Sequence, residues 1–154
     1  MGKSLITTEE LHKELDLVQG CIMRMAQNSF VIKGWAFTLV VALIALTAEK
    51  ISLPILCATG IFILLTFWGL DAFFLKTEKL YRFKYEWIIE QRPLGNKNYL
   101  YDLNPTNKKM CKKNRKTPTT FQVMFSKPYT LLLFYGNPIL VCLVLLVLRL
   151  CSLM

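Results

Sequence analysis

The amino-acid sequence predicts an all-α membrane protein with three transmembrane helices, an N-terminal amphipathic helix and a cytoplasmic extension of the second span. The 154-residue chain is 54% hydrophobic, which is too apolar and too short for a soluble protein of several domains. Three uncharged apolar stretches come close to the ~20 residues that a helix needs to cross a ~30 Å hydrocarbon layer. The segment 76–127, between the second and third stretches, has 13 basic and 4 acidic residues and so carries the whole net charge of +9.

An amphipathic helix is predicted over residues 7–30, within a first segment of residues 1–30. Thr7 and Glu10 have the spacing of a capping box. Apolar residues then recur at alternating steps of four and three, namely Leu11, Leu15, Val18, Ile22 and Met25. Such a seam packs on the protein's own cytoplasmic loop, lies on the lipid surface or pairs with another subunit, and the sequence leaves these alternatives open.

A transmembrane hairpin with a helical extension is predicted over residues 31–92. The first span covers residues 34–48 together with the apolar residues in front of them, and the second covers residues 51–70. Glu49 and Lys50 form the turn between the two spans. Pro54 lies in the opening turn of the second helix, where its missing N–H is tolerated.

The second span is expected to continue into the cytoplasm as one long helix that ends at Pro93 and Gly95. Aromatic and aliphatic residues repeat at intervals of seven along this extension. They predict a seam for a homo-oligomer, formed by Phe73, Leu80, Trp87, Tyr81 and Ile88. The alternative is that this face and the face of the helix over residues 7–30 bury each other within one subunit.

A basic cytoplasmic loop is predicted over residues 93–128. Its densest part is a solvated run, expected to bind acidic lipid headgroups, that comprises Lys108, Lys109, Lys112, Lys113, Arg115 and Lys116. Nucleic acid or a nucleotide is the other candidate ligand, although no aromatic residues interleave with the basic ones and no glycine-rich phosphate cradle is present. Residues 119–125 fit either a short strand or an interfacial segment.

The third span is predicted over residues 129–148, within a last segment of residues 129–154. The sequence Gly136-Asn137-Pro138 predicts a kink in this helix. The amide of Asn137 needs a partner in lipid, either across a helix contact or along a water-filled path. It is equally suited to cap the backbone carbonyls that Pro138 leaves free.

Asp71 is the polar residue with the strongest claim to a role in the membrane. It closes the second span, where an ionised carboxylate is costly without a partner. Lys33 lies 17 residues before the turn at Lys50 and Asp71 lies 21 after it, so an antiparallel hairpin brings them to similar depth. Arg24 and Arg82 are alternative partners, and a hydrated Asp71 at the cytoplasmic interface is the simpler interpretation.

The remaining chemistry predicts a protein that is neither an enzyme nor a metal or cofactor carrier. The five cysteines are spread singly and His12 is the one imidazole, so neither a disulfide framework nor a zinc site is indicated. No serine, cysteine or metal-dependent catalytic arrangement is recognisable. We therefore expect no catalytic residues and no cofactor.

The orientation follows from the distribution of positive charge. A cytoplasmic N-terminus and a cytoplasmic loop place 17 of the 19 basic residues inside, which leaves only Lys50 and Arg149 outside. The C-terminus is then periplasmic if the membrane is a bacterial inner membrane.

Two stretches resemble a group of small bacterial membrane proteins encoded in anti-phage defence loci. They are Asn28-Ser29-Phe30 followed by Lys33-Gly34-Trp35, and Trp68 to Leu75 followed by Glu78, Tyr81 and Arg82. That group includes transmembrane effectors of retron and cyclic-oligonucleotide systems. The resemblance implies an inner-membrane effector that a partner holds silent and that disrupts the membrane when released.

Two other functions are compatible with the sequence. A membrane anchor or sensor would recruit a soluble partner through the basic loop and the N-terminal helix. A transporter is disfavoured, because three spans without an internal repeat do not supply the two-fold architecture that transporters usually have.

Overall fold

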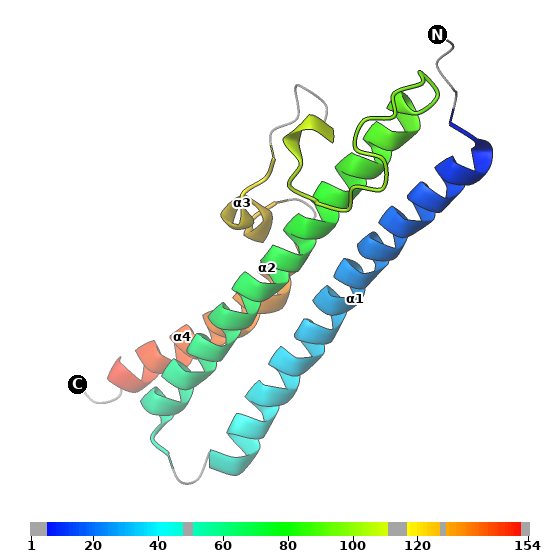
Figure 1. Ribbon diagram of the computed structural model, residues 1–154. Coiled ribbons are helices and arrows are strands. Elements are labelled where there is room, and N and C mark those ends of the chain that lie inside the picture. The colour runs from blue at the N-terminus through cyan, green and yellow to red at the C-terminus, as the bar shows by residue number, and fades with distance from the viewer. Residues whose placement is uncertain (1–5, 48–50, 111–116, 127–128, 152–154) are drawn as a thin grey trace. The chain divides into compact units, whose positions relative to one another are not determined.

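The computed structural model describes residues 6–47, 51–110, 117–126 and 129–151. Every regular element in these ranges is helical: α1 (Thr8–Thr47), α2 (Leu53–Gln91), the 3-10 helix η1 (Lys108–Met110), α3 (Thr120–Met124) and α4 (Thr130–Cys151), as Figure 1 shows. By length and composition, α1, α2 and α4 are long and apolar enough to cross a membrane. The predicted fold class, all-α with three candidate spans, is confirmed.

The helix α1 begins at the predicted capping box. The N–H of Glu10 donates to Oγ1 of Thr7 at 3.2 Å, and the N–H of Thr7 donates to Oε2 of Glu10 at 3.0 Å. The hydrogen bonds from the backbone and side chain of Thr7 hold the pKa of the Glu10 carboxyl below its usual value. From there α1 runs without interruption to Thr47, so the expected boundary at residue 30 falls inside a single helix.

The helix α2 is the long continuous helix that the sequence predicts. Pro54 lies in its first turn, and α2 ends at Gln91, two residues before Pro93. Gly95 follows with a φ of 75°, a conformation that glycine adopts without strain. The predicted turn at Glu49 and Lys50 lies outside the described residues.

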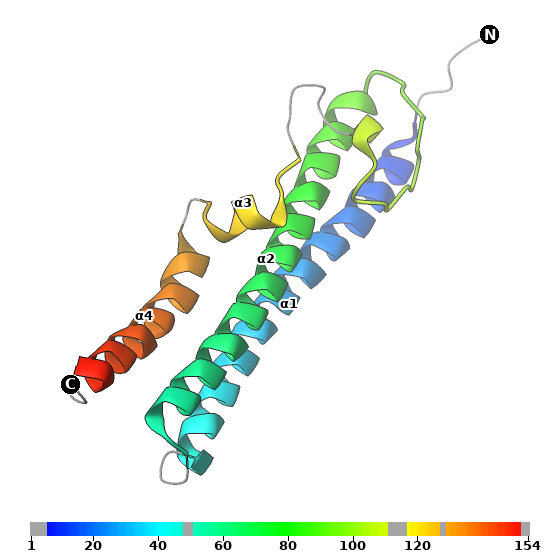
Figure 2. The ribbon, with the colours of Figure 1, turned by 90° about the vertical axis from the view of Figure 1, so that its left-hand side faces the viewer.

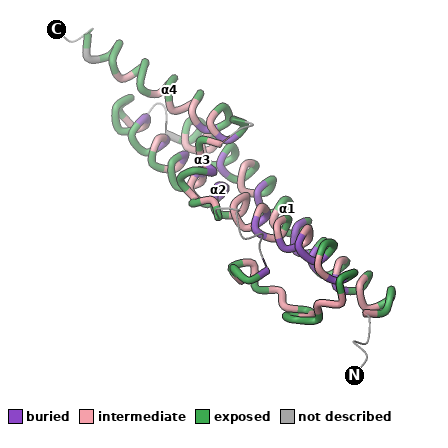
Figure 3. The backbone as a smooth tube through the Cα atoms, turned by 90° about the horizontal axis from the view of Figure 1, so that it is seen from above, coloured by how far each residue is buried: buried purple, intermediate pink, exposed green. Residues whose placement is uncertain are grey.

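The chain divides into two compact units, and α1 and α2 each contribute to both. The loop unit comprises Met1–Gln27 and Phe74–Pro118, and the span unit comprises Asn28–Phe73 and Thr119–Met154. Within each unit the segments of α1 and α2 lie side by side and antiparallel (Figure 2). In Figure 3 the buried positions follow the strip where the two helices meet, while many positions on their outer faces are exposed.

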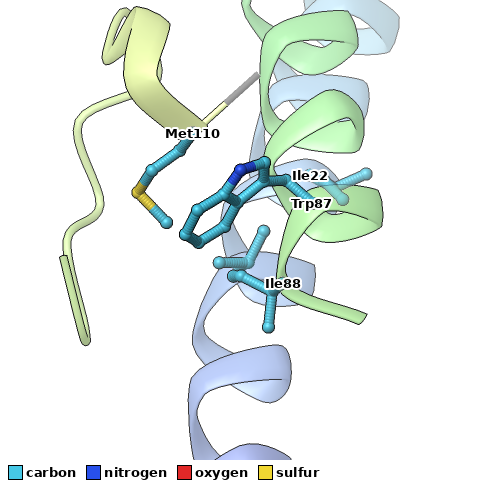
Figure 4. Close-up of a cluster of buried hydrophobic side chains, with 5 residues drawn as sticks. Ile22, Trp87, Ile88 and Met110 are labelled. Carbon is cyan, nitrogen blue, oxygen red and sulfur yellow. The ribbon is translucent and has the colours of Figure 1, made fainter. Parts of the chain in front are cut away.

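The core of the loop unit consists of apolar side chains from α1, α2 and η1. Val18, Ile22, Trp87, Ile88 and Met110 are all buried in one cluster (Figure 4). The apolar seam predicted for residues 7–30 therefore packs on α2 and on the protein's own loop, which was one of the three alternatives. Met110 is fully buried although the two lysines that precede it are exposed.

This core corrects the predicted oligomer seam. Leu80, Trp87 and Ile88 are buried within the loop unit, and Tyr81 is half-buried with its hydroxyl donating to the carbonyl of Leu103 at 3.1 Å. Phe73 alone remains exposed. The seven-residue repeat was a real packing signal, but its partners are α1 and the loop of the same subunit and not a second copy.

Two buried cations hold the loop that follows α2. The guanidinium of Arg92 donates to both carboxylate oxygens of Glu14 at 2.7 Å and to the carbonyl of Asn96 at 2.6 Å. The ammonium of Lys84, which is 1% exposed, donates to the carbonyl of Asn104 at 2.8 Å. The loop residues thereby satisfy two charges that would be costly to bury unpaired.

Short polar turns shape the same loop. A side-chain oxygen accepts a hydrogen bond from the backbone N–H two residues further on at Asn96, Asp102, Asn104 and Asn107. Burial raises the pKa of Asp102. Hydrogen bonds from Asn107 and from the N–H of Asn104, together with the charge of Lys84, lower this pKa by more than burial raises it, so the net shift is downward. Residues 93–110 are therefore an ordered structure and not a simple solvated loop.

Of the predicted basic patch, Lys108 and Lys109 are exposed, and Nζ of Lys109 lies 5.9 Å from the ring centroid of Tyr99. Lys112, Lys113, Arg115 and Lys116 lie outside the described residues.

The segment predicted as a strand or an interfacial segment is the short helix α3. Its N-cap is Thr119, whose side-chain oxygen accepts from the N–H of Gln122 at 3.2 Å, and the N–H of Thr119 donates to Oε1 of Gln122 at 3.0 Å. The strand alternative is thus wrong, because a capping box begins a helix here. In the span unit α4 follows and continues as a helix through Pro138.

Candidate functional site

A buried ion pair lies among the three helices of the span unit. Nζ of Lys33 is 2.6 Å from Oδ2 of Asp71. The Asp71 side chain is 0% exposed, whereas that of Lys33 is 24% exposed. The predicted pairing of these two residues is therefore present in the structure.

Two hydroxyl groups complete the coordination of the carboxylate. Ser29 donates its hydroxyl to Oδ1 of Asp71 and accepts a hydrogen bond from Nζ of Lys33 at 2.8 Å. Tyr135 donates its hydroxyl to Oδ2 of Asp71 at 3.2 Å. We call these four residues, Ser29, Lys33, Asp71 and Tyr135, the polar cluster.

Each of the three apolar helices supplies part of the polar cluster. Ser29 and Lys33 are four residues apart on α1, which places them on the same face one turn apart. Asp71 comes from α2 and Tyr135 from α4. The hydroxyl of Tyr135 thus ties α4 to the ion pair of the hairpin.

An aromatic layer packs beside the polar cluster. Trp68, three residues before Asp71 on α2, stacks on Tyr135 with ring centroids 6.2 Å apart and an interplanar angle of 12°. It also contacts the ring of Phe125 at 5.3 Å. Within the described residues, Nε1 of Trp68 is a buried donor without a hydrogen-bond partner. Trp68 and Tyr135 are both buried in this layer.

The arrangement stabilises a pair of opposite charges in apolar surroundings. An ionised Asp71 receives hydrogen bonds from one ammonium and two hydroxyls, so its charge is compensated while the helices stay together. Separating the helices would leave the carboxylate and the ammonium without these partners. An intramembrane ionisable residue of this kind is a functional-site candidate by default.

The other predicted polar residues do not join the polar cluster. Arg82 pairs with Glu78 at 2.7 Å, and Arg24 donates to Sγ of Cys21. Asn137 is exposed on α4, and its amide has no hydrogen-bond partner in the part of the chain that the structure describes. It does not cap the carbonyls near Pro138, as one of the predicted alternatives required.

Ser29 and Tyr135 had no predicted role in the site. Ser29 lies one helical turn before Lys33, and that spacing was a usable signal once Lys33 was chosen. Tyr135 had no such signal, because the sequence pattern of the third span does not show which of its residues lies beside Asp71 in the hairpin.

The fold and the polar cluster together define an all-α protein with three candidate membrane spans and a buried ion pair shared among them. No known protein family, curated protein or solved structure matches the chain.

Proposed function

We propose that the chain is an anti-phage defence effector of the bacterial inner membrane that permeabilises or depolarises the membrane when it is activated. The proposal includes several copies of the chain and a soluble partner that holds them silent. It draws on the resemblance of residues 28–35 and 68–82 to such effectors, and it assigns no catalytic step and no cofactor.

The observation that supports this proposal is the polar cluster inside the apolar helices. A fully coordinated Asp71 favours a closed arrangement of α1, α2 and α4, because helix separation strands its charge. A membrane helix bundle that keeps a charge pair in its interior has two alternatives, a dry closed state and a state in which water reaches the charges. Activation would select the second state.

The test is the membrane potential of cells that express the chain. Induced expression should collapse the potential reported by a voltage-sensitive dye, and Asp71→Asn should change the dose or rate of collapse several-fold. Asp16→Asn is the matched control, because Asp16 is an exposed carboxylate on α1 in the loop unit. An unchanged potential at membrane levels verified by immunoblot would contradict the proposal.

The second candidate function is a membrane anchor or sensor that recruits a soluble partner. The ordered loop held by Arg92 and Lys84 favours it, since a folded surface suits protein recognition better than a solvated basic run. The exposed Lys108 and Lys109 remain candidates for acidic lipid headgroups or a nucleotide. An anchor would leave the membrane potential unchanged and would co-purify with its partner.

The proposed orientation places the N-terminus and the loop in the cytoplasm and the C-terminus in the periplasm. In a background without native cysteines, a membrane-impermeant thiol reagent added from the periplasmic side should label Met154→Cys. Lys112→Cys should become reactive only after the cells are opened. Labelling of Lys112→Cys in intact cells would reverse the orientation.

A further inference from the structure

We infer that the outward face of α4 is an interface with α4 of a second copy of this chain, in which Asn137 pairs with Asn137 of that copy. The inference extends the proposed function, which calls for several copies but does not say where they meet. Exposed residues on α4 carry it.

Asn137 is a polar side chain without a partner in an apolar helix. It lies seven residues after the first residue of α4, or ~10 Å along the helix axis, so it is well inside a span of this length. Its amide is exposed and unpaired within the described residues. An amide facing hydrocarbon is unfavourable, and such groups in spans usually form hydrogen bonds across helices.

Asn137 stands in a seam of exposed apolar residues. The steps along the seam alternate between four and three residues, the spacing of helices that pack at a shallow left-handed angle. Its apolar members are between 49% and 60% exposed. We define the α4 seam as Leu133, Asn137, Leu140, Val144, Val147 and Cys151.

The opposite face of α4 is already occupied by its own subunit. Leu131 and Tyr135 are buried, and Tyr135 contacts Asp71 and Trp68 of α2. Pro138 and Cys142 line an apolar cavity of ≈ 380 Å³ that residues of α1 and α2 also line. The α4 seam begins two residues after Leu131, which turns it by about 200° from this inward face.

The chemistry of the α4 seam favours a second copy of the chain as its binding partner. All copies insert with the same orientation, so two α4 helices meet in parallel, and a two-fold axis brings identical residues to the same depth. A carboxamide both donates and accepts hydrogen bonds, and therefore two Asn137 side chains complement each other. No charge in the α4 seam opposes this pairing.

The geometry also places the two Cys151 side chains near each other. Cys151 is a free, exposed cysteine eighteen residues after Leu133, which is five full helical turns, and so it shares the seam's line. Arg149 lies at nearly the same depth, and its side chain is exposed, but it is on the line of Leu131 and not on that of Leu133. The chain thus contains a crosslinking position and a matched position for a control.

The crosslinking experiment uses the full chain in bacterial membranes, with the cysteines other than Cys151 changed to alanine. Copper phenanthroline with oxygen accepts two electrons from two thiols, whose protons are released as the disulfide forms. A disulfide-linked dimer is expected. The Cys151→Ala, Arg149→Cys control should crosslink at least several-fold less. Equal crosslinking at both positions, or none at Cys151, would overturn the inference.

A second measurement keeps the native cysteines and compares association in mild detergent by native mass. Asn137→Leu should weaken association roughly tenfold, which corresponds to ~1.4 kcal/mol. Asn137→Gln should retain most of it because it keeps the amide. An Asn137→Leu chain that associates as well as the unaltered one would refute the α4 seam.

The two proposals fail separately. If association depends on Asn137 but the membrane potential of the cells stays normal, the result supports the α4 seam and contradicts the effector function. Depolarisation by a monomeric chain, with Asn137→Leu equally active, keeps the effector function and removes the interface.

Discussion

Replacing Asp71 by alanine is expected to destabilise the span unit by about 3–5 kcal/mol, because it leaves the Lys33 ammonium without its partner in an apolar environment. The cost is large since the Asp71 side chain is fully buried and takes part in three interactions, with Lys33, Ser29 and Tyr135. The measurement is the free energy of unfolding in mixed micelles, from an SDS titration followed by circular dichroism.

The double variant isolates the interaction between the two charges. Lys33→Ala strands the carboxylate, whereas Lys33→Ala with Asp71→Ala strands neither charge, so the double change should cost less than the sum of the two single changes. Asp16→Ala serves as the control and should stay within about 0.5 kcal/mol. Strictly additive costs would mean that the short distance between Lys33 and Asp71 contributes no coupling.

The helices of this protein were predictable because their signals are periodic and local. The capping box at Thr7 and Glu10 and the proline that follows Gln91 at position 93 are both visible in the sequence. The continuity of α1 through residue 30 to Thr47 was not predicted. The pairing of Lys33 with Asp71 could also be predicted, because residues at similar distances along the chain from a tight hairpin turn lie at similar depth in the membrane.

Two features of the structure could not be predicted from the sequence, each for a physical reason. The seam from Leu80 to Ile88 has the same period whether it packs on its own subunit or on another one, so periodicity could not choose the partner. The order of residues 93–110 depends on Arg92, whose buried partner Glu14 is 78 residues away. Five Asn and Asp residues between positions 96 and 107, spaced two to four residues apart, were the one local sign of those turns.

The second large effect concerns that distant pair: Arg92→Ala is expected to destabilise the loop unit by about 3–5 kcal/mol. The guanidinium and the Glu14 carboxylate are 0% and 1% exposed, and the carbonyls of Asn96, Asn98 and Tyr99 accept from the same guanidinium. The variant therefore leaves a buried charge and three carbonyls without their donor.

Limited proteolysis provides the most direct measurement, because the loop should open where Arg92 no longer holds it. Cleavage between residues 93 and 110 should accelerate by at least tenfold in Arg92→Ala, and Arg92→Lys should recover little because an ammonium cannot reproduce the bidentate contact. The matched control is Arg82→Ala: the Arg82 side chain is 59% exposed in its pair with Glu78, and such pairs contribute only about 0.3–0.5 kcal/mol. If both variants are cleaved at the same rate, Arg92 does not order the loop, and the contact with Glu14 serves only to join α1 to α2.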